Sequence, residues 1–249
     1  MLFFAPQARA ERYQNPQQAI QPEARQLFTL ANEAREAQGL RPLQWDTALA
    51  AAAHEHCLRM AAEGPIAHQY RGELALADRA GQAGAHFSLI EENVALAPDP
   101  ASIHDGWMHS PGHRSNLLNS EVNRVGIAVV AGRNGLYAVA DYAKDVQVMT
   151  AAQVEAAIAR LLRSKGIGIL AENSTARAAC VQDHGMPRGK AGEQPRFVMR
   201  WQDAQLNQLP GALTEQIQTG NYRRAAVGSC PAQVAEGAFT AYRVAVLLY

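Results

Sequence analysis

Two β-rich runs joined by a tight turn, residues 124–131 and 136–142, constrain the fold of this chain most. The four residues between the runs read Gly-Arg-Asn-Gly, a composition typical of a β-hairpin turn. The segments before this hairpin show helical rather than strand periodicity. The first half of the chain is therefore predicted to be a set of helices followed by two antiparallel strands.

The helical segments are bounded by recognisable start and stop residues. They are expected at residues 22–38, 47–63, 73–80, 101–109 and 113–119. Asp46 is a suitable N-cap for the second segment, which ends at Gly64-Pro65. Ser110 and Pro111 are the expected N-cap and first residue of the last one. Apart from the short helix, residues 64–90 are rich in Gly and Ala, poorly periodic, and predicted to be a loop.

A boundary is expected near residues 144–150, which divides the chain into a first unit, 22–147, and a smaller α+β unit, 148–249. The second unit is predicted to contain helices at 151–164 and 210–219, β runs at 196–201, 222–229 and 239–248, and a loop at 171–195. None of its segments contains a cluster of residues typical of a catalytic or metal-binding site. If the protein is exported, Cys180 and Cys230 are the expected disulfide pair, and Cys57 stays as a small buried residue.

Composition excludes several classes of partner. The 249 residues are 48% hydrophobic and 18% charged, and 23 Lys and Arg balance 23 Asp and Glu, so nucleic acid and anionic membrane surfaces are poor partners. No apolar run is long enough for a transmembrane helix. Residues 1–21 are predicted to be a leader. Its apolar start and Ala8-Arg9-Ala10 fit either the remnant of an export signal or a frayed terminus.

Histidine is the informative residue type. Seven of the eight histidines fall between residues 54 and 113, and imidazole serves both metal binding and acid–base chemistry near neutral pH. His54 and His56 point to different faces of a helix and do not form a metal-binding pair. Sequence marks of serine hydrolases, P-loops and dinucleotide-binding folds are absent from the chain.

The segment from Trp107 to Leu118 is the richest in chemistry. Pro111 and Gly112 predict a corner between two helices, which places His113 in the first turn of the second. The helix dipole there disfavours the imidazolium, and a neutral ring can bind a metal or accept a proton. The alternative is that His113 caps the turn and packs against Trp107.

Residues 92–95, Glu-Asn-Val-Ala, together with Trp107 and the run Ser-Pro-Gly-His-Arg-Ser-Asn-Leu-Leu at 110–118, resemble the bacterial branch of the CAP superfamily. This superfamily groups cysteine-rich secretory proteins, antigen 5 and pathogenesis-related proteins, and its domain is also called SCP. Three further features occur in the same order as in this family. They are the run Leu-Arg-Pro-Leu-Gln-Trp-Asp at 40–46, His68 and the closing hairpin. The resemblance covers about residues 22–145, and the last 100 residues lie outside it.

The resemblance implies an α+β fold, a three-layer α-β-α sandwich, with an open cleft lined by histidines and glutamates. Matched by motif, His68, Glu92 and His113 are the expected cleft residues and the expected ligands of zinc or another divalent cation. Asn93 is expected to bind backbone and fix its loop.

The chain departs from the family pattern at one position. The second family glutamate is replaced by Ser110, and Glu73, Glu91 and His109 are the candidates to substitute for it. The metal-binding interpretation therefore competes with a hydrogen-bonded His/Glu cluster that only orders the cleft.

Three functions are compatible with these observations. The first is a secreted or periplasmic binding module for a small ligand, lipid or peptide, which the lack of a nucleophile–base pair favours over an enzyme. The second is a structural protein that displays the C-terminal unit in the cell envelope. The third is a zinc-dependent hydrolase, which the histidine cluster favours.

Overall fold

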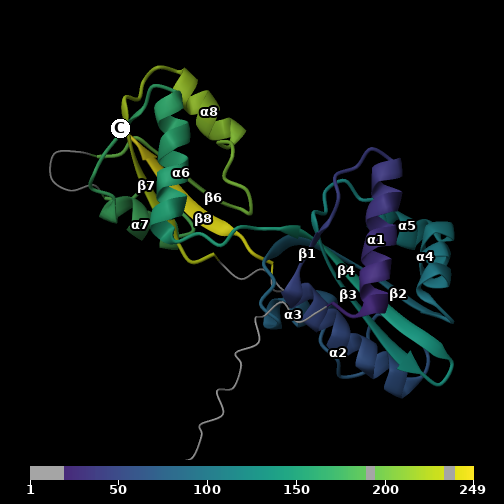
Figure 1. The fold of residues 1–249 in the computed structure, drawn as a ribbon. Helices are drawn as coiled ribbons and strands as arrows, with labels where there is room; N and C mark the ends of the chain where they lie inside the picture. The colour runs from purple at the N-terminus through teal and green to yellow at the C-terminus, as the bar shows by residue number, and fades with distance from the viewer. Residues whose placement is uncertain (1–19, 189–193, 233–238) are drawn as a thin grey trace, which may run out of the picture.

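The computed structural model describes residues 20–188, 194–232 and 239–249. The apolar start of the chain and Ala8-Arg9-Ala10, interpreted above as an export-signal remnant, lie outside these residues. Two four-stranded sheets organise the described part of the chain, one in each of two units (Figure 1).

The first unit contains nine elements, which alternate between helices and strands before the final hairpin. They are α1 (Pro22–Ala37), β1 (Gln44–Trp45), α2 (Thr47–Glu63), α3 (Leu76–Gln82), β2 (Phe87–Ala97), α4 (Pro100–His109), α5 (Pro111–Leu117), β3 (Arg124–Gly132) and β4 (Gly135–Asp145). The strand order is β1-β3-β4-β2. The β1–β3 pair is parallel, and the β3–β4 and β4–β2 pairs are antiparallel.

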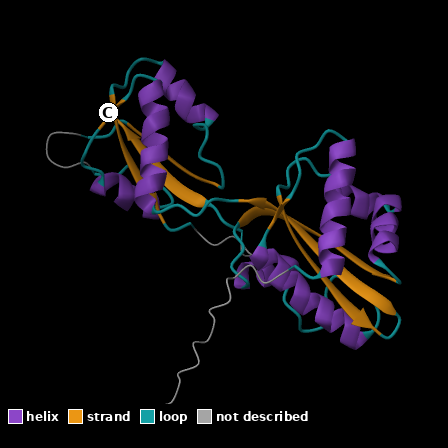
Figure 2. Ribbon diagram, viewed as in Figure 1, coloured by secondary structure: helices purple, strands orange, loops and turns teal. Residues whose placement is uncertain are grey.

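Helices cover both faces of this sheet (Figure 2). Leu27 of α1 and Trp107 of α4 are buried against Val125 of β3 in one core. On the opposite face, Cys57 of α2 packs with Val139 of β4 in a second core. The first unit is therefore an α+β protein with three layers, α-β-α, and the predicted fold class is confirmed.

Local sequence accounts for the ends of α2. The Asp46 carboxylate accepts hydrogen bonds from the backbone N–H groups of Ala48 and Leu49 at 2.9 and 3.0 Å, as an N-cap does. Gly64 ends the helix at φ 100°, a left-handed conformation that glycine adopts without steric penalty. Cys57 is a buried free thiol, as expected.

One local prediction in this unit was wrong, and the predicted N-cap Ser110 was confirmed in position. The loop predicted at residues 64–90 already contains the start of β2, because Phe87 and Leu89 pair with Asp145 and Lys144 of β4. This pairing partner lies more than fifty residues away and leaves no mark in the local sequence. Ser110 occupies the N-cap position of α5, but its side chain makes no capping hydrogen bond.

The described residues of the second unit form seven elements. They are α6 (Ala151–Ser164), β5 (Gly168–Ile169), α7 (Ser174–Val181), β6 (Phe197–Asp203), α8 (Gly211–Gln218), β7 (Arg224–Cys230) and β8 (Tyr242–Leu248). The sheet is covered by α6 and α8 on one face and by α7 on the other. Helix α7 lies inside the loop predicted at 171–195. The expected disulfide between Cys180 and Cys230 is present and joins α7 to β7.

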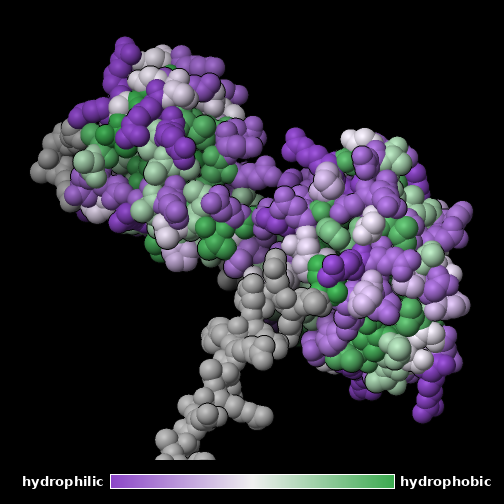
Figure 3. Space-filling view, viewed as in Figure 1, coloured by the Kyte–Doolittle hydropathy of each residue, from purple (hydrophilic) through white to green (hydrophobic). Residues whose placement is uncertain are grey.

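The segment that leads into β8 contacts the first unit. The Thr240 N–H donates to the Phe87 carbonyl at 2.8 Å, and the rings of Phe87 and Phe239 lie 5.3 Å apart. Hydrophilic residues spread across the visible face of both units, with smaller hydrophobic patches between them (Figure 3). Of the helices described, none has the length and apolar content needed to cross a membrane.

Candidate functional site: a buried carboxylate network beneath two imidazoles

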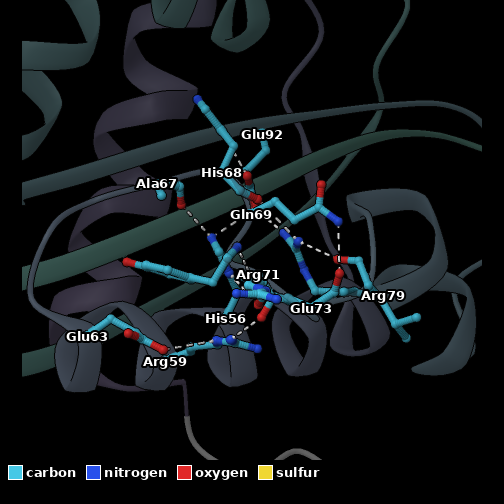
Figure 4. Close-up of polar contacts among 12 residues, drawn as sticks. His56, Arg59, Glu63, Ala67, His68, Gln69, Arg71, Glu73, Arg79 and Glu92 are labelled. Atoms are coloured by element: carbon cyan, nitrogen blue, oxygen red, sulfur yellow. Dashed lines mark hydrogen bonds and ion pairs between the residues drawn. The ribbon is translucent and has the colours of Figure 1, made fainter.

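Glu92 is the centre of a polar cluster between β2, α2 and α3 (Figure 4). The residue is 6% exposed, and its two carboxylate oxygens have different partners. Arg79 Nη2 of α3 donates to Oε2 at 2.5 Å, and His68 Nδ1 lies 2.8 Å from Oε1. A buried carboxylate is stable when a cation and hydrogen bonds compensate its lost hydration, and both are supplied here.

A second acid–histidine pair extends the cluster toward α2. His56 is fully buried, with Nδ1 2.7 Å from Glu73 Oε1 and Nε2 2.8 Å from the Ala67 carbonyl. Both ring nitrogens of His56 therefore lie within hydrogen-bond distance of an oxygen. Burial raises the pKa of Glu73, but hydrogen bonds from the Tyr70 N–H and from His56 outweigh it, so the net pKa is lowered.

Asp141 of β4 adds a second buried carboxyl beside Glu92. The two residues are direct partners across the β2–β4 pair, and Asp141 is 0% exposed. Burial, followed by the neighbouring Glu92 carboxylate, raises the pKa of Asp141 well above its usual range. Of these two adjacent carboxyls, Glu92 pairs with Arg79, and Asp141 is the one whose pKa burial raises.

Above this network, two imidazoles face each other. The ring centroids of His68 and His113 lie 6.4 Å apart. The amide of Asn93 donates to the His113 carbonyl at 2.9 Å and accepts from Asn116 at 3.0 Å, which ties the start of α5 to β2. Asn93 therefore binds backbone, as the sequence predicted.

The pKa values of the two imidazoles are shifted in opposite directions. The hydrogen bond with Glu92 is the main cause that raises the pKa of His68. Burial, followed by the charge of His68, lowers the pKa of His113. The expectation of a neutral His113 agrees with this direction, although the causes are burial and a neighbouring charge rather than the helix dipole.

The structure brings together His68, Glu92, His113 and Asn93, but His109 does not join them. The His109 side chain is exposed on α4, where Nδ1 lies 2.9 Å from the Asp105 carbonyl and 3.1 Å from its carboxylate. Its inclusion among the cleft residues is corrected accordingly, because the corner at Ser110-Pro111-Gly112 separates it from His113.

Of the candidates for the second family glutamate, Glu73 reaches the cluster through His56. Glu91 is directed elsewhere, because neighbouring strand residues alternate between the faces of a sheet. Its carboxylate accepts from the Asn119 amide at 3.1 Å.

The expected metal ligands do not fit a zinc site as they are arranged. Within the described residues, no group of three or more His, Cys, Asp and Glu side chains could hold a metal ion. Both oxygens of Glu92 are already engaged by Arg79 and His68, and a ligand carboxylate would need one of them free. We therefore derive no metal-dependent step from this cluster.

The opposite pKa directions of the two imidazoles give a testable prediction. As the pH falls, His68 is expected to take up its proton first, and His113 to stay neutral below the ordinary imidazole value of about 6.5. The contribution of His68 to folding stability is thus present below about pH 6.5, the ordinary imidazole value, and is lost as the pH rises through the raised pKa of His68. The contribution of His113 to folding stability is lost as the pH falls through the lowered pKa of His113. An NMR titration of the ring resonances measures both; titration of His113 above His68 would refute the assignment.

Sequence reasoning missed His56, Arg79 and Asp141 as members of the cluster. Asp141 carried a usable signal, because it shares a strand face with the apolar Val139 and Tyr137, and an acid on a buried face needs an explanation. Arg79 carried no such signal, since only the fold shows that it meets Glu92.

The first unit is similar to a known family of proteins. Residues 28–142 match the model of the cysteine-rich secretory protein family, CAP. The matched residues lie within the first unit, which is therefore similar to the CAP domain. The match ends before the second unit begins.

Two relatives and one similar structure, all from bacteria, illustrate the likeness. The uncharacterized membrane protein YlbC of Bacillus subtilis is 33% identical over 107 residues, which are 42% of this chain and 31% of YlbC. YkwD of the same organism is 30% identical over 43% of this chain and 42% of its own length. The chain thus spans less than half the length of both relatives. An extracellular SCP-domain protein from Bacillus anthracis is 28% identical over 49% of this chain and 40% of that one, with a TM-score of 0.46.

Proposed function

We propose that this protein is an extracellular or periplasmic binding module whose ligand site is the pair of imidazoles His68 and His113. The observation that carries the proposal is the buried Glu92–Arg79 ion pair, which fixes Nδ1 of His68 while the His68 side chain stays 60% exposed. A charged network that orients an exposed ring resembles the support that binding sites need, because it holds the contact atoms in place before the ligand arrives.

The two rings offer complementary hydrogen bonding. His68, with its raised pKa, is a donor, and neutral His113 supplies one donor and one acceptor nitrogen. A ligand group that both accepts and donates, such as a hydroxyl or an amide, satisfies this pair. Ile66 and Leu74, each more than 40% exposed on the same loop as His68, offer apolar contact to the rest of a small ligand, lipid or peptide.

The described residues favour binding over covalent catalysis. Among them, no hydrogen bond joins a serine or cysteine side chain to a histidine, which is the arrangement that activates a nucleophile. Burial raises the pKa of Cys57 to about 12, so its thiolate does not form near neutral pH.

A second candidate function is display of the C-terminal unit. The contacts of Thr240 and Phe239 with Phe87 link the second unit to the first. Such contacts favour a defined placement of the second unit over a free tether.

Co-purification tests the binding proposal. The full chain, exported by a bacterial host, is extracted with organic solvent and with acid, and the extracts are compared by mass spectrometry. We expect a molecule that is retained by the wild type and by His109→Ala, whose ring is exposed outside the cluster, and that is lost from the double variant His68→Ala/His113→Ala. Equal retention by all three proteins, or by none, contradicts the proposal.

A further inference from the structure

The second sheet repeats the topology of the first. Its strand order is β5-β7-β8-β6, which matches β1-β3-β4-β2 strand for strand. The β5–β7 pair is parallel and the other two pairs are antiparallel, as in the first sheet. Helices α6, α7 and α8 occupy the same places in chain order as α1, α2 and α4, and on the same faces (Figure 1).

A close backbone approach occurs at the same place in both units. Gly126 of β3 lies against Leu49 and Ala50, the third and fourth residues after the N-cap of α2. Gly228 of β7 lies against Ala176 and Arg177, the third and fourth residues after the N-cap of α7. An added Cβ at either glycine would come within 3.0 Å of helix backbone. The two units share their sheet topology and this glycine–helix contact, which indicates that both units have the same fold.

The register then identifies the counterpart of the Glu92 site. In the first sheet, Asp141 pairs with Gly126 on one side and with Glu92 on the other. In the second sheet, Ala245 pairs with Gly228 on one side and with Arg200 on the other. Arg200 therefore occupies the position of Glu92, and Ala245 that of Asp141.

We infer that the second unit is a shortened copy of the CAP fold in which the carboxylate site has become an arginine site for a small oxyanion, a phosphate or a carboxylate. The proposal is independent of the function proposed for the first unit. It concerns the face of the second sheet that α7 covers.

Two arginines meet on this face. Arg200 donates from Nε to the Ala179 carbonyl at 2.6 Å and from Nη2 to the Gly185 carbonyl at 2.8 Å. Arg243 lies two residues from Ala245 on β8 and hence on the same face, with its side chain 10% exposed. Its Nη2 donates to the Asp183 carboxylate at 2.8 Å.

Two guanidinium groups lie on this face of the described part of the unit. Burial, followed by the charge of Arg243, lowers the pKa of Arg200, and the charge of Asp183 acts in the opposite direction. Among the described residues, Asp183 is the carboxylate that pairs with this couple, and its side chain is 67% exposed. An oxyanion placed between the guanidinium groups would relieve the repulsion and accept charge-assisted hydrogen bonds from both.

Anion titration of the full chain tests the inference. Inorganic phosphate and acetate are each added at constant ionic strength against sodium chloride, and the arginine Nε–Hε resonances are followed by NMR. We expect the Arg200 and Arg243 signals to shift with saturation, and the stronger of the two anions to identify the preferred class. Shifts that chloride reproduces overturn the site.

Variants separate anion binding from a purely structural role. Arg200→Gln is expected to weaken anion affinity at least tenfold, as followed on the Arg243 signal, while the control Arg160→Gln, exposed on α6, leaves it unchanged. If Arg200→Gln fails to fold, Arg200→Lys keeps the charge but loses the planar fork, and affinity should still fall several-fold. Unchanged affinity in a folded Arg200 variant would show that Arg200 only holds the end of α7.

Discussion

Replacing Gly126 by alanine is expected to unfold the first unit or to reduce its stability by about 3 kcal/mol or more. The added methyl group would lie within 3.0 Å of the Ala50 nitrogen and the Leu49 carbonyl carbon. Both are backbone atoms of a helix that packs on the strand, so no side-chain rotation relieves the overlap. Since a domain is stable by only about 5–15 kcal/mol, this loss is visible in denaturant unfolding followed by circular dichroism.

Two matched glycine substitutions serve as controls for Gly126→Ala. Gly106→Ala lies in α4 with no atom within 4 Å of the new methyl, so it should be neutral or stabilise by about 0.5–1 kcal/mol. Gly228→Ala places a methyl within 3.0 Å of Ala176 and Arg177 and should disrupt the second unit instead. Wild-type stability of Gly126→Ala would mean that β3 and α2 are less closely packed than described.

Glu92→Gln is expected to destabilise the first unit by about 3–5 kcal/mol. The neutral amide keeps the shape of the side chain but removes the charge that balances Arg79, whose side chain is 7% exposed. A buried cation without its partner is costly because neither water nor another charge replaces the lost interaction. Urea unfolding at pH 7 measures the loss. A second consequence is that the pKa of His68 falls, since its main cause of elevation is gone.

Asp141→Asn is the control, and it should behave in the opposite way. Because the pKa of Asp141 is raised by burial, the native state holds a proton that the unfolded state releases near pH 4. This contribution to stability is present below the unfolded value and is lost as pH rises toward the native one. Asparagine is neutral at every pH, so the variant does not lose stability by releasing a proton from residue 141 as the pH rises. The variant should therefore match or exceed wild-type stability at pH 7, and a loss as large as that of Glu92→Gln would refute a neutral Asp141.

Short-range features of the sequence predicted much of the fold. Asp46, Gly64 and the hairpin glycines act on neighbouring residues, so they fix the ends of α2 and the turn between β3 and β4 wherever these elements pack. The strands β1 and β5 were missed because each consists of two residues and exists only through parallel pairing with β3 and β7. Helix α7 was missed because the Gly, Pro and charge around it are typical of a loop.

The sequence alone determined the helices other than α7, the hairpin and the motif residues Glu92, Asn93 and His113, because each depends on chain neighbours or on a spacing within one segment. The tertiary structure alone decided what these residues do. The directions in which the pKa values of Asp141 and His68 shift depend on burial and on charges from other elements. No local pattern carries that information, because the electrostatic energy of a buried group is set by the atoms that surround it in space.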